Sequence, residues 1–549
     1  MRCAVHLLLC LAAVLVPPLR AATHTAASPA LADVQAAVNL CAPGDTVNVP
    51  AGSNIWTGTL TITNDINVIG SGIGLTIITN DVAANLVNWQ TASNGGCRLS
   101  GIQFEAGPLD GSHSSSGSQN FYFHGFTPAL RVDHCRFDYL QNLNDVVTMD
   151  DCVFGVFDHN TINLRYAGFI EVQMPAYGGV PYADGSWADA DNWSSTNCLC
   201  FEDNVFYEDT NAAVFAAALG AQAGARVIFR NNFVTNCWVG SHGTESDARV
   251  RSVRWLQIYG NTFCVPTNQP LYFPNFQEAV LFRGGTGVVY SNTVVGGFLH
   301  VGEVATYRAY PFNFTPWNNV SGANGYDSNN PTVYASGTLN GSTWTAAQTV
   351  NQTLTTNVYQ DTNLNLAANA YVNYWLWDTN QNLGEQITAN TSNTFTVLNA
   401  CPSSYTTNIS GAVVFLNGDH YQLRAPPYAA LDMPGMGRSD LMSNAVPPSV
   451  WPHEVVEPIC LWANTWIYQW PNNWYGHSYA AANDTLSANS FLTNTVMPGY
   501  TALIYPHPLV TTTNRSSGLP PVVTTNLVAV PGWIIVGPGT NISVYPYWR

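Results

Sequence analysis

A cluster of ionisable side chains stands out in a chain that is otherwise poor in charge. Asp, Glu, Lys and Arg make up only 9% of the residues, and all 17 basic residues are Arg. Within residues 239–254, the groups able to do chemistry are His242, Glu245, Arg249, Arg251 and Arg254. Imidazole exchanges a proton near neutral pH, and a guanidinium group binds a carboxylate through two parallel hydrogen bonds.

These residue types meet the needs of β-elimination on a uronic acid. That reaction needs a group that neutralises the substrate carboxylate, a base for the C5 proton and an acid for the leaving oxygen. The predicted catalytic residues are His242 as base or acid, Glu245 to orient it or ligate calcium, and Arg249 and Arg254 to bind carboxylates. Arg251 and Arg283 are predicted substrate-binding residues. The alternative is a surface lattice of ion pairs without catalytic function.

A short repeated pattern predicts the elements that position this cluster. A polar pair followed by Asn-x-Phe, or a close variant, recurs at steps of 25, 44, 27, 30 and 31 residues, and its Cys or Asn positions are Cys135, Asn160, Asn204, Asn231, Asn261 and Asn292. Repeats of this length indicate stacked structural units. Their β-branched and aromatic segments favour strands. Three short strands with their turns fill about 25–30 residues, which is one coil of a parallel β-helix.

The repeated Asn has a structural explanation. An inward Asn at a tight turn bonds to the backbone and to the Asn of the neighbouring coils, and Asn tolerates left-handed turns. The apolar residue three positions before it and the one two positions after it are expected in the core. The two residues that precede the Asn are expected to face solvent at the bend.

Carboxylates recur beside this turn. Asp133, Asp158 and Glu202 occupy equivalent positions of successive coils, so they would lie about 5 or 10 Å apart. Those separations bracket the two glycosidase geometries and also suit calcium. Asp158 and Glu202 are therefore predicted metal ligands, with calcium as the candidate cofactor. The alternative is that they are ordinary turn residues.

A long aromatic loop accounts for the 44-residue step. It contains four predicted substrate-binding aromatics, Tyr177, Tyr182, Trp187 and Trp193. Loops that leave a solenoid build binding walls, and aromatic rings stack on sugar faces. Simple coverage of one side of the solenoid is the alternative.

The N-terminal region carries a family resemblance. Residues 28–40 read as an amphipathic helix, followed by "PGDTVNVPAG" at 43–52 and "INVIGSG" at 66–72. This order resembles the opening of secreted pectate-lyase-like proteins, and the resemblance extends to about residue 315. It implies an all-β, right-handed parallel β-helix whose N-terminal helix caps the first coil. In enzymes of this family an Arg or Lys acts as the base and acidic side chains hold calcium, so the resemblance implies an Arg here.

The chain divides into five predicted segments. Residues 1–22 form a signal peptide, because Arg2 precedes an apolar run that ends in small residues. Residues 23–319 form the β-helix with its cap. Residues 320–425 lose the pattern and are predicted as a small inserted β module. Coils resume at 426–510, where "LWANTW" returns, and 511–549 form a linker and tail.

Composition restricts compartment and partners. The signal peptide and the lack of a later apolar segment predict a secreted or cell-surface protein without a membrane span. Removing Arg2 and Arg20 leaves 17 − 2 = 15 Arg against 34 acids, a charge near −19, which argues against nucleic acid as a partner. Ten cysteines follow the signal, and none of them forms a CxxC pair, so the sequence argues against a zinc site. They are expected as stacked core residues or as one or two disulfides.

The sequence thus predicts a protein that acts on polysaccharide, as a lyase or hydrolase of an acidic glycan. The competing hypothesis is a non-catalytic adhesin or structural solenoid, because this fold hosts unrelated functions. An enzyme predicts that Arg249, Arg254 and His242 converge on one groove beside the loop at 174–193. A scaffold predicts that they scatter. The oligomeric state is not determined by the sequence.

Overall fold

The fold follows from a computed structural model of the chain. It describes residues 21–92, 95–108, 119–140, 145–164, 168–179, 183–208, 216–242, 252–265, 278–296, 298, 300–306, 333–344, 356–372, 374–380, 383–398, 417–424, 434–435, 457–467, 475–479 and 491–511. Of the predicted site residues, Glu245, Arg249, Arg251 and Tyr182 lie outside the described residues. Among the described helices, none has the length and apolar character needed to cross a bilayer.

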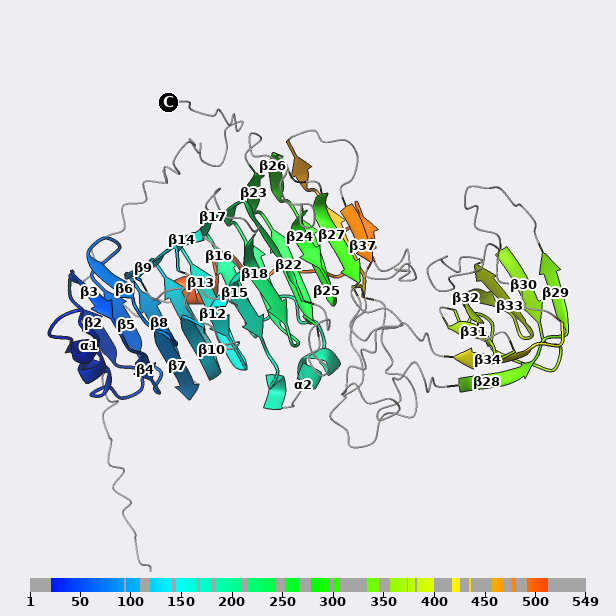
Figure 1. The fold of residues 1–549 in the computed structure, drawn as a ribbon, viewed down its shortest axis with the longest axis horizontal. Helices are drawn as coiled ribbons and strands as arrows, with labels where there is room; N and C mark the ends of the chain where they lie inside the picture. The colour runs from blue at the N-terminus through cyan, green and yellow to red at the C-terminus, as the bar shows by residue number, and fades with distance from the viewer. Residues whose placement is uncertain are drawn as a thin grey trace, which may run out of the picture.

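Three ladders of parallel strands wind around one core (Figure 1). The first ladder holds the strands that precede the Asn turn: β1 Thr23–Thr25, β2 Thr46–Val49, β5 Asn67–Gly70, β8 Gly96–Ser100, β10 Phe121–Asp133, β13 Cys152–Asp158, β16 Leu199–Glu202, β19 Arg226–Arg230, β22 Trp255–Tyr259, β25 Thr286–Tyr290, β35 Ile459–Trp462 and β38 Phe491–Thr493.

The second ladder precedes the first within each coil. Its strands are β4 Leu60–Ile62, β7 Val87–Ala92, the first half of β10, β12 Asp145–Met149, β15 Gly168–Gln173, β18 Ala216–Gln222, β21 Cys237–Ser241, β24 Glu278–Phe282, β27 His300–Thr306 and β37 Tyr475–Tyr479. The third ladder follows the Asn turn and holds β3 Gly52–Trp56, β6 Thr76–Asn80, β9 Gln103–Ala106, β11 Arg136–Asp138, β14 Thr161–Leu164, β17 Val205–Glu208, β20 Phe233–Thr235, β23 Thr262–Val265, β26 Thr293–Gly296 and β36 Thr465–Trp466. This topology confirms the predicted right-handed parallel β-helix.

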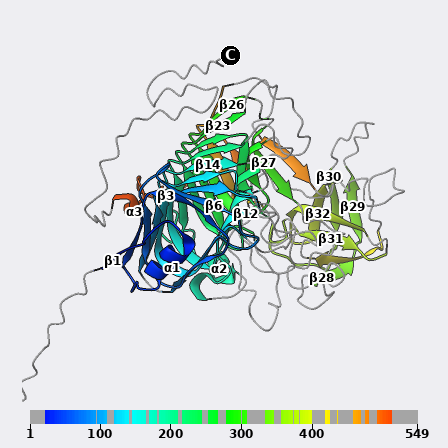
Figure 2. The same cartoon turned by 60° about the vertical axis from the view of Figure 1, so that its left-hand side comes forward.

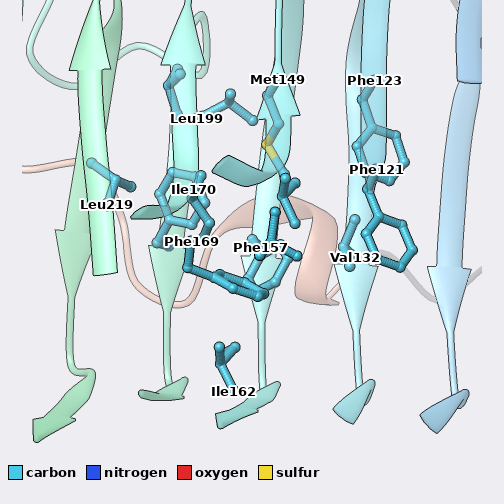
Figure 3. Close-up of a cluster of buried hydrophobic side chains, with 14 of the residues drawn as sticks. Phe121, Phe123, Val132, Met149, Phe157, Ile162, Phe169, Ile170, Leu199 and Leu219 are labelled. Atoms are coloured by element: carbon cyan, nitrogen blue, oxygen red, sulfur yellow. The ribbon is translucent and has the colours of Figure 1, made fainter. Parts of the chain in front are cut away.

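One apolar core runs through the coils, because alternate residues of each strand point inward. Figure 3 shows part of it, where Phe121, Phe157 and Phe169 lie between the ladders. Several rings stack along the axis, such as Phe104 on Phe137 with centroids 5.6 Å apart. Burying this apolar surface supplies the main favourable term for folding.

A short helix covers the N-terminal end of the core (Figure 2). It spans Leu31–Val38 (α1), within the predicted 28–40 range, and buries Val34, Ala37 and Val38. The adjacent strand β1 pairs with β2 in parallel register. The cap thus closes the end of the solenoid, as the sequence predicts.

A separate antiparallel sheet lies within the predicted inserted module. Its strands are β28 Val333–Thr338, β29 Gly341–Trp344, β30 Thr356–Gln360, β31 Trp375–Asp378, β32 Leu383–Asn390, β33 Thr394–Leu398 and β34 His420–Arg424. It has its own apolar cluster, which includes Leu376, Phe395 and Leu423. The strand that follows, β35, pairs with β25 across the insertion, so the solenoid resumes after the module. The exact domain boundaries stay predictions.

The repeated Asn forms a hydrogen-bonded column inside the turn. Asn204 Oδ1 accepts from Asn160 N and Nδ2 at 2.9 and 3.1 Å, and Asn204 Nδ2 donates to Phe157 O at 2.8 Å. The same pattern continues through Asn232, Asn261, Asn292 and Asn464. In the buried members Asn160, Asn204, Asn232, Asn261 and Asn292, the side-chain amide donates both to a backbone carbonyl and to the next Asn, which is what burial requires.

The structure differs from the predicted turn in two details: which Asn joins the column in one coil, and which residue takes the left-handed conformation. The column uses Asn232 rather than Asn231, because Asn231 takes the left-handed conformation (φ 55°) one position earlier. The residue before the column Asn is left-handed in the other coils too, for example His159 (φ 55°) and Asp203 (φ 58°). The turn therefore places its strain on the preceding residue and leaves the Asn free to point inward.

Replacing Asn232 with Ala should destabilise the solenoid by about 3 kcal/mol, because it leaves buried partners in two neighbouring coils unsatisfied. The matched control is Asn231→Gly, since this exposed neighbour already has a positive φ that glycine adopts without strain. Urea unfolding monitored by circular dichroism measures both. Equal midpoints for the two variants would contradict the structural role of the column.

The carboxylates beside the turn are buried, contrary to the solvent-facing position predicted for them. Asp133, Asp158 and Glu202 are fully buried, whereas His134 and His159 are partly exposed. Arg131 pairs with Asp158 at 2.9 Å, and Arg230 pairs with Glu202 at 2.6 Å. Burial alone would raise the pKa of Asp133, but hydrogen bonds from Arg98 and His134 hold it below its usual range.

A C-terminal strap, residues 495–511, explains this burial. It runs back over the outer face of the first ladder. It ends in a short helix, Pro508–Thr511 (α3), which lies at the side of the solenoid (Figure 2). Its contacts with the ladder are Tyr500 Oη to Gln257 Oε1 (2.7 Å), Arg230 Nη1 to Leu503 O (2.7 Å), His507 N to Glu202 Oε1 (2.8 Å) and Arg131 Nη1 to Leu509 O (3.3 Å). The predicted coils at 426–510 did not anticipate this path, because it has no repeat pattern.

The strap should make stability sensitive to mild acid. Burial, with nearby Arg230, lowers the pKa of His507 to about 4. In the unfolded chain a histidine titrates near about 6.5, so the unfolded state takes up the proton first. Unfolding free energy should therefore fall between about pH 6.5 and pH 4, by about 3 kcal/mol from this group. Urea titrations of the protein and of His507→Asn across this window test it; identical pH slopes would contradict it.

The nine described cysteines are buried and form no disulfides among themselves. This matches the expectation of stacked core cysteines for the described part of the chain. Cys401 lies outside it.

Candidate functional site

A polar site lies on the outer face of the second ladder, at β15, β18 and β21. Ile170 and Val172 point into the core, so Glu171 between them points outward. The register places Glu171 beside Gly220 and Gly220 beside Gly240. The missing side chain of Gly220 leaves room next to the carboxylate, whereas Leu281 and Trp238 lie against Gly240.

His242 follows β21 and fills this space. Its Nε2 lies 3.7 Å from Glu171 Oε2, and its side chain is 32% exposed against 4% for Glu171. The backbone holds the residue in place, since His242 N donates to Ala221 O at 2.8 Å and Ser252 Oγ donates to His242 O at 2.7 Å. The imidazole is therefore open to a ligand, whereas its carboxylate partner is shielded from water.

Arg283 approaches His242 from the next coil. Its Nη2 lies 3.1 Å from His242 Nε2 and also within hydrogen-bonding distance of Nδ1. Its Nε donates to Ser241 O at 2.9 Å, and its backbone N donates to Ser241 Oγ at 2.9 Å. The guanidinium also lies over the ring of Trp238, 5.9 Å from the centroid. These contacts fix the direction of its positive charge.

The three side chains determine which nitrogen of His242 holds a proton. A guanidinium donates and never accepts, and a carboxylate accepts. The contacts are satisfied together when Nε2–H faces Glu171 and Nδ1 accepts from Arg283, an assignment made from the hydrogen-bonding partners. In that state the imidazole is neutral, and Nδ1 is able to act as a base.

A second polar group lies on the same face, two coils earlier. Tyr122 Oη donates to Asp150 Oδ2 at 2.9 Å, and the Tyr122 ring stacks on His124 with centroids 4.3 Å apart. Burial, together with the neighbouring Asp151, raises the pKa of Asp150. Strand register places Thr148 between Tyr122 and Glu171, so the backbones of Tyr122 and Glu171 lie two coils, or about 10 Å, apart. The second ladder thus presents polar groups over several coils.

Gly220 is required for the contact between Glu171 and His242. A Cβ atom there would lie 2.6 Å from Glu171 Oε2 and 3.0 Å from His242 Nε2. Because both atoms are side-chain ends, Gly220→Ala should displace them with little loss of stability. We expect about a 10- to 100-fold loss in the rate of any reaction that uses this contact, since small displacements at a reacting centre have effects of this size.

The matched control is Gly302→Ala, on β27 of the same ladder. There a Cβ atom would lie no closer than 3.6 Å to a neighbouring atom, an ordinary contact. Melting temperature and specific activity are measured for both variants. Full activity of Gly220→Ala, or equal losses in both variants, would contradict the functional role of the Glu171–His242 contact.

The predicted arginine cluster is divided between two faces. His242 and Arg283 meet, but Arg254 is fully buried on the first ladder, paired with Asp191 and Glu457 at 2.6 Å each. The prediction that Arg254 and His242 share one groove is therefore wrong, because Arg254 anchors the long loop instead. The sequence also missed Glu171, although a lone carboxylate in the apolar run "GFIEVQ" is the signal that reveals it.

The long aromatic loop covers the first ladder rather than walling the site. It contains a 3-10 turn, Tyr177–Gly179 (η1), and a short helix, Asp184–Ala188 (α2). Trp187 is fully buried and donates to Ser252 O at 3.0 Å. Tyr177 is 8% exposed, and Trp193 lies against Trp255 and Tyr500. Burial of these side chains favours the alternative given above, in which the loop covers one side of the solenoid, over a role in sugar binding.

The predicted metal role of Asp158 and Glu202 stays a prediction, and their surroundings disfavour it. Each carboxylate accepts hydrogen bonds from a guanidinium group, Arg131 for Asp158 and Arg230 for Glu202. A second positive charge at the same oxygens would be repelled. The role of calcium is likewise untested.

No protein-family model matches the sequence, and no curated protein sequence matches it. Several solved structures, including the following three, are similar at low level. The A-module of the mannuronan C-5 epimerase of Azotobacter vinelandii shares 13% identity over 50% of this chain and 67% of its own, with a TM-score of 0.27. The Agl-KA catalytic domain shares 13% over 53% and 59%, with a TM-score of 0.25.

The third is a tailspike protein mutant of E. coli bacteriophage HK620 in complex with a pentasaccharide. It shares 12% identity over 72% of this chain and 89% of its own, with a TM-score of 0.26. At these scores the β-helix rests on the strand pairing described above, and the site has to be argued from its own residues.

Proposed function

We propose that this protein cleaves an acidic polysaccharide at the outer face of its second ladder, as a lyase. The carrying observation is that His242 lies between Glu171 and Arg283, with its imidazole open to solvent. A cation beside a candidate base is the pairing that elimination from a uronate needs, because neutralising the carboxylate acidifies the C5–H bond. The β-helix scaffold and its extended polar row suit a long chain of sugars.

The three residues have separate roles in the proposed reaction. The substrate carboxylate replaces His242 as the acceptor for Arg283, which frees Nδ1. Nδ1 takes the C5 proton, the C5–H electrons form the C4–C5 double bond, and the C4–O bond breaks. The leaving oxygen receives a proton from water. Glu171 faces Nε2–H and stabilises the imidazolium that forms.

A hydrolase is the second candidate, supported by Asp150. Asp150 lies one coil from Glu171 and about two residues further along the strand direction, so the two backbones are roughly 8 Å apart. Inverting hydrolysis needs carboxyl groups about 6.5–9.5 Å apart, one of them protonated, and this backbone spacing permits such a separation. Burial of Asp150 raises its pKa in the direction that this acid role needs.

Products distinguish the two reactions. Pectate, alginate and glycosaminoglycans are incubated with the protein, with and without calcium, while ultraviolet absorbance and reducing ends are followed. A lyase generates unsaturated ends that absorb, together with reducing ends. A hydrolase generates reducing ends alone. Unchanged absorbance and reducing ends on every substrate would reject cleavage and favour the non-catalytic adhesin or scaffold.

A further inference from the structure

His24, Cys41 and Asp45 converge beside the N-terminal cap, far from the second-ladder site. They come from β1, from the end of the turn after α1, and from the residue before β2. One potential ligand atom of each, an imidazole nitrogen, the thiol sulfur and a carboxylate oxygen, lies within 4.8 Å of the others. Among the described residues, these are the His, Cys, Asp and Glu side chains whose potential ligand atoms lie this close together.

The backbone builds this group rather than leaving it to flexible side chains. Register pairs His24 with Val47, which fixes β1 against β2. Asp45 Oδ1 accepts from Ala22 N at 2.6 Å, and Oδ2 accepts from Ala42 N at 2.8 Å. Gly44, with φ 90°, makes the tight turn that brings Cys41 and Asp45 together. The carboxylate is thus oriented from two sides.

The imidazole is directed at the other two ligands. His24 Nε2 is buried, makes no hydrogen bond within the described residues and lies 3.5 Å from Asp45 Oδ2. Ligand atoms around tetrahedral zinc are about 3.5 Å apart, because the metal–ligand bonds are about 2.0–2.3 Å. Cys41 and Asp45 are 8% and 7% exposed, so the site is shielded but reachable from the His24 side.

We propose that His24, Cys41 and Asp45 bind a zinc ion that ties the N-terminal strand to the cap. Nitrogen, sulfur and oxygen ligands together are typical of zinc, and three of them leave one position for water. The site is independent of the proposed cleavage reaction. Motif spacing missed it because its members lie on different elements and no CxxC pair marks them.

Zinc binding at this site should release a proton. An ordinary cysteine thiol titrates at about pH 8.5. The thiol is therefore protonated at neutral pH, and the metal has to displace that proton. Apparent affinity should rise about tenfold for each pH unit between pH 6 and pH 8, after correction for the imidazole.

The experiment uses the full chain, reduced and without a histidine tag. Zn²⁺ is titrated by calorimetry in two buffers of different ionisation enthalpy, which counts released protons. Co²⁺ is then added as a spectroscopic probe, because cobalt–thiolate coordination gives near-ultraviolet absorption. The variants are Cys41→Ala and His24→Gln, and the control is Cys97→Ala, a buried cysteine outside the group.

We expect one zinc per chain, a cobalt–thiolate band, and an affinity at least tenfold weaker in both ligand variants but unchanged in the control. Zinc should raise the melting temperature of the unmodified protein and of Cys97→Ala, but not that of Cys41→Ala or His24→Gln. Absence of binding, absence of the thiolate band, or equal affinity in Cys41→Ala and Cys97→Ala would overturn the proposal. If a ligand variant misfolds without metal, the spectrum of the unmodified protein still decides the question.

Discussion

His242→Gln should lower the turnover of acidic polysaccharide by about 10²- to 10⁴-fold, the size of the contribution expected from a positioned base. Glutamine keeps the volume and a hydrogen-bonding group but accepts no proton. The side chain is about one third exposed, so the fold should survive the change. Initial rates across a range of substrate concentrations separate turnover from binding, and melting temperature reports the fold.

Arg283 should affect a different kinetic parameter. Arg283→Met removes the charge that is held by Ser241 and stacked near Trp238. We expect weaker binding of the native polysaccharide and a much smaller effect on a carboxyl-reduced version. Arg136→Met, at an exposed arginine of the third ladder, is the control and should retain activity. Activity of His242→Gln within about threefold of the unmodified protein, or no dependence on the substrate carboxylate, would exclude this chemistry.

Glu202→Ala should lower the free energy of unfolding by about 3–5 kcal/mol, the largest stability effect expected from a single change in this chain. Glu202 is fully buried, pairs with Arg230 at 2.6 Å and accepts from His507 N at 2.8 Å. Its removal leaves a buried guanidinium without its counter-charge and loosens the strap. Urea unfolding measures the loss, and limited proteolysis at residues 495–511 measures strap release.

The double variant Glu202→Leu with Arg230→Met is the control for this explanation. It removes the unpaired buried charge, so part of the lost stability should return. The rest stays lost because Arg230 also donates to Leu503 O, and His507 N to Glu202 Oε1. If the double variant is less stable than Glu202→Ala, the buried unpaired charge is not the cause. Comparing the single variants Glu202→Leu and Arg230→Met with the double variant isolates the pair from its surroundings.

The solenoid could be predicted because its signal is local and repeated. Each coil carries its own apolar positions and its own buried Asn, so several independent copies support one interpretation. The error at Asn231 and Asn232 shows the limit of this signal. Two adjacent Asn residues fit the sequence pattern equally, and only the left-handed backbone of Asn231 decides which one turns inward.

The site could be predicted only in part because its members come from three coils. His242 was found from an unusual local cluster, but its carboxylate partner Glu171 lies many residues earlier and meets it through strand register. Arg254 was assigned to the same cluster from proximity in sequence. Strand alternation and the long loop place it on the first ladder instead, with Asp191 and Glu457.

The strap was missed for a related reason. Residues 495–511 contain no coil pattern, and their partners, such as Glu202 and Arg131, lie hundreds of positions earlier. The predicted coils at 426–510 include almost all of this segment, although it buries a row of charges that would otherwise face solvent at the turn.

The most direct test is a crystal structure of His242→Gln soaked with oligouronates from pectate, alginate and glycosaminoglycans, the substrate classes of the proposed cleavage. The account predicts a sugar carboxylate bonded to Arg283, with C5 facing position 242 and the chain running along the second ladder toward Tyr122. An oligosaccharide bound on another face, or bound here with its carboxylate directed away from Arg283, would contradict it.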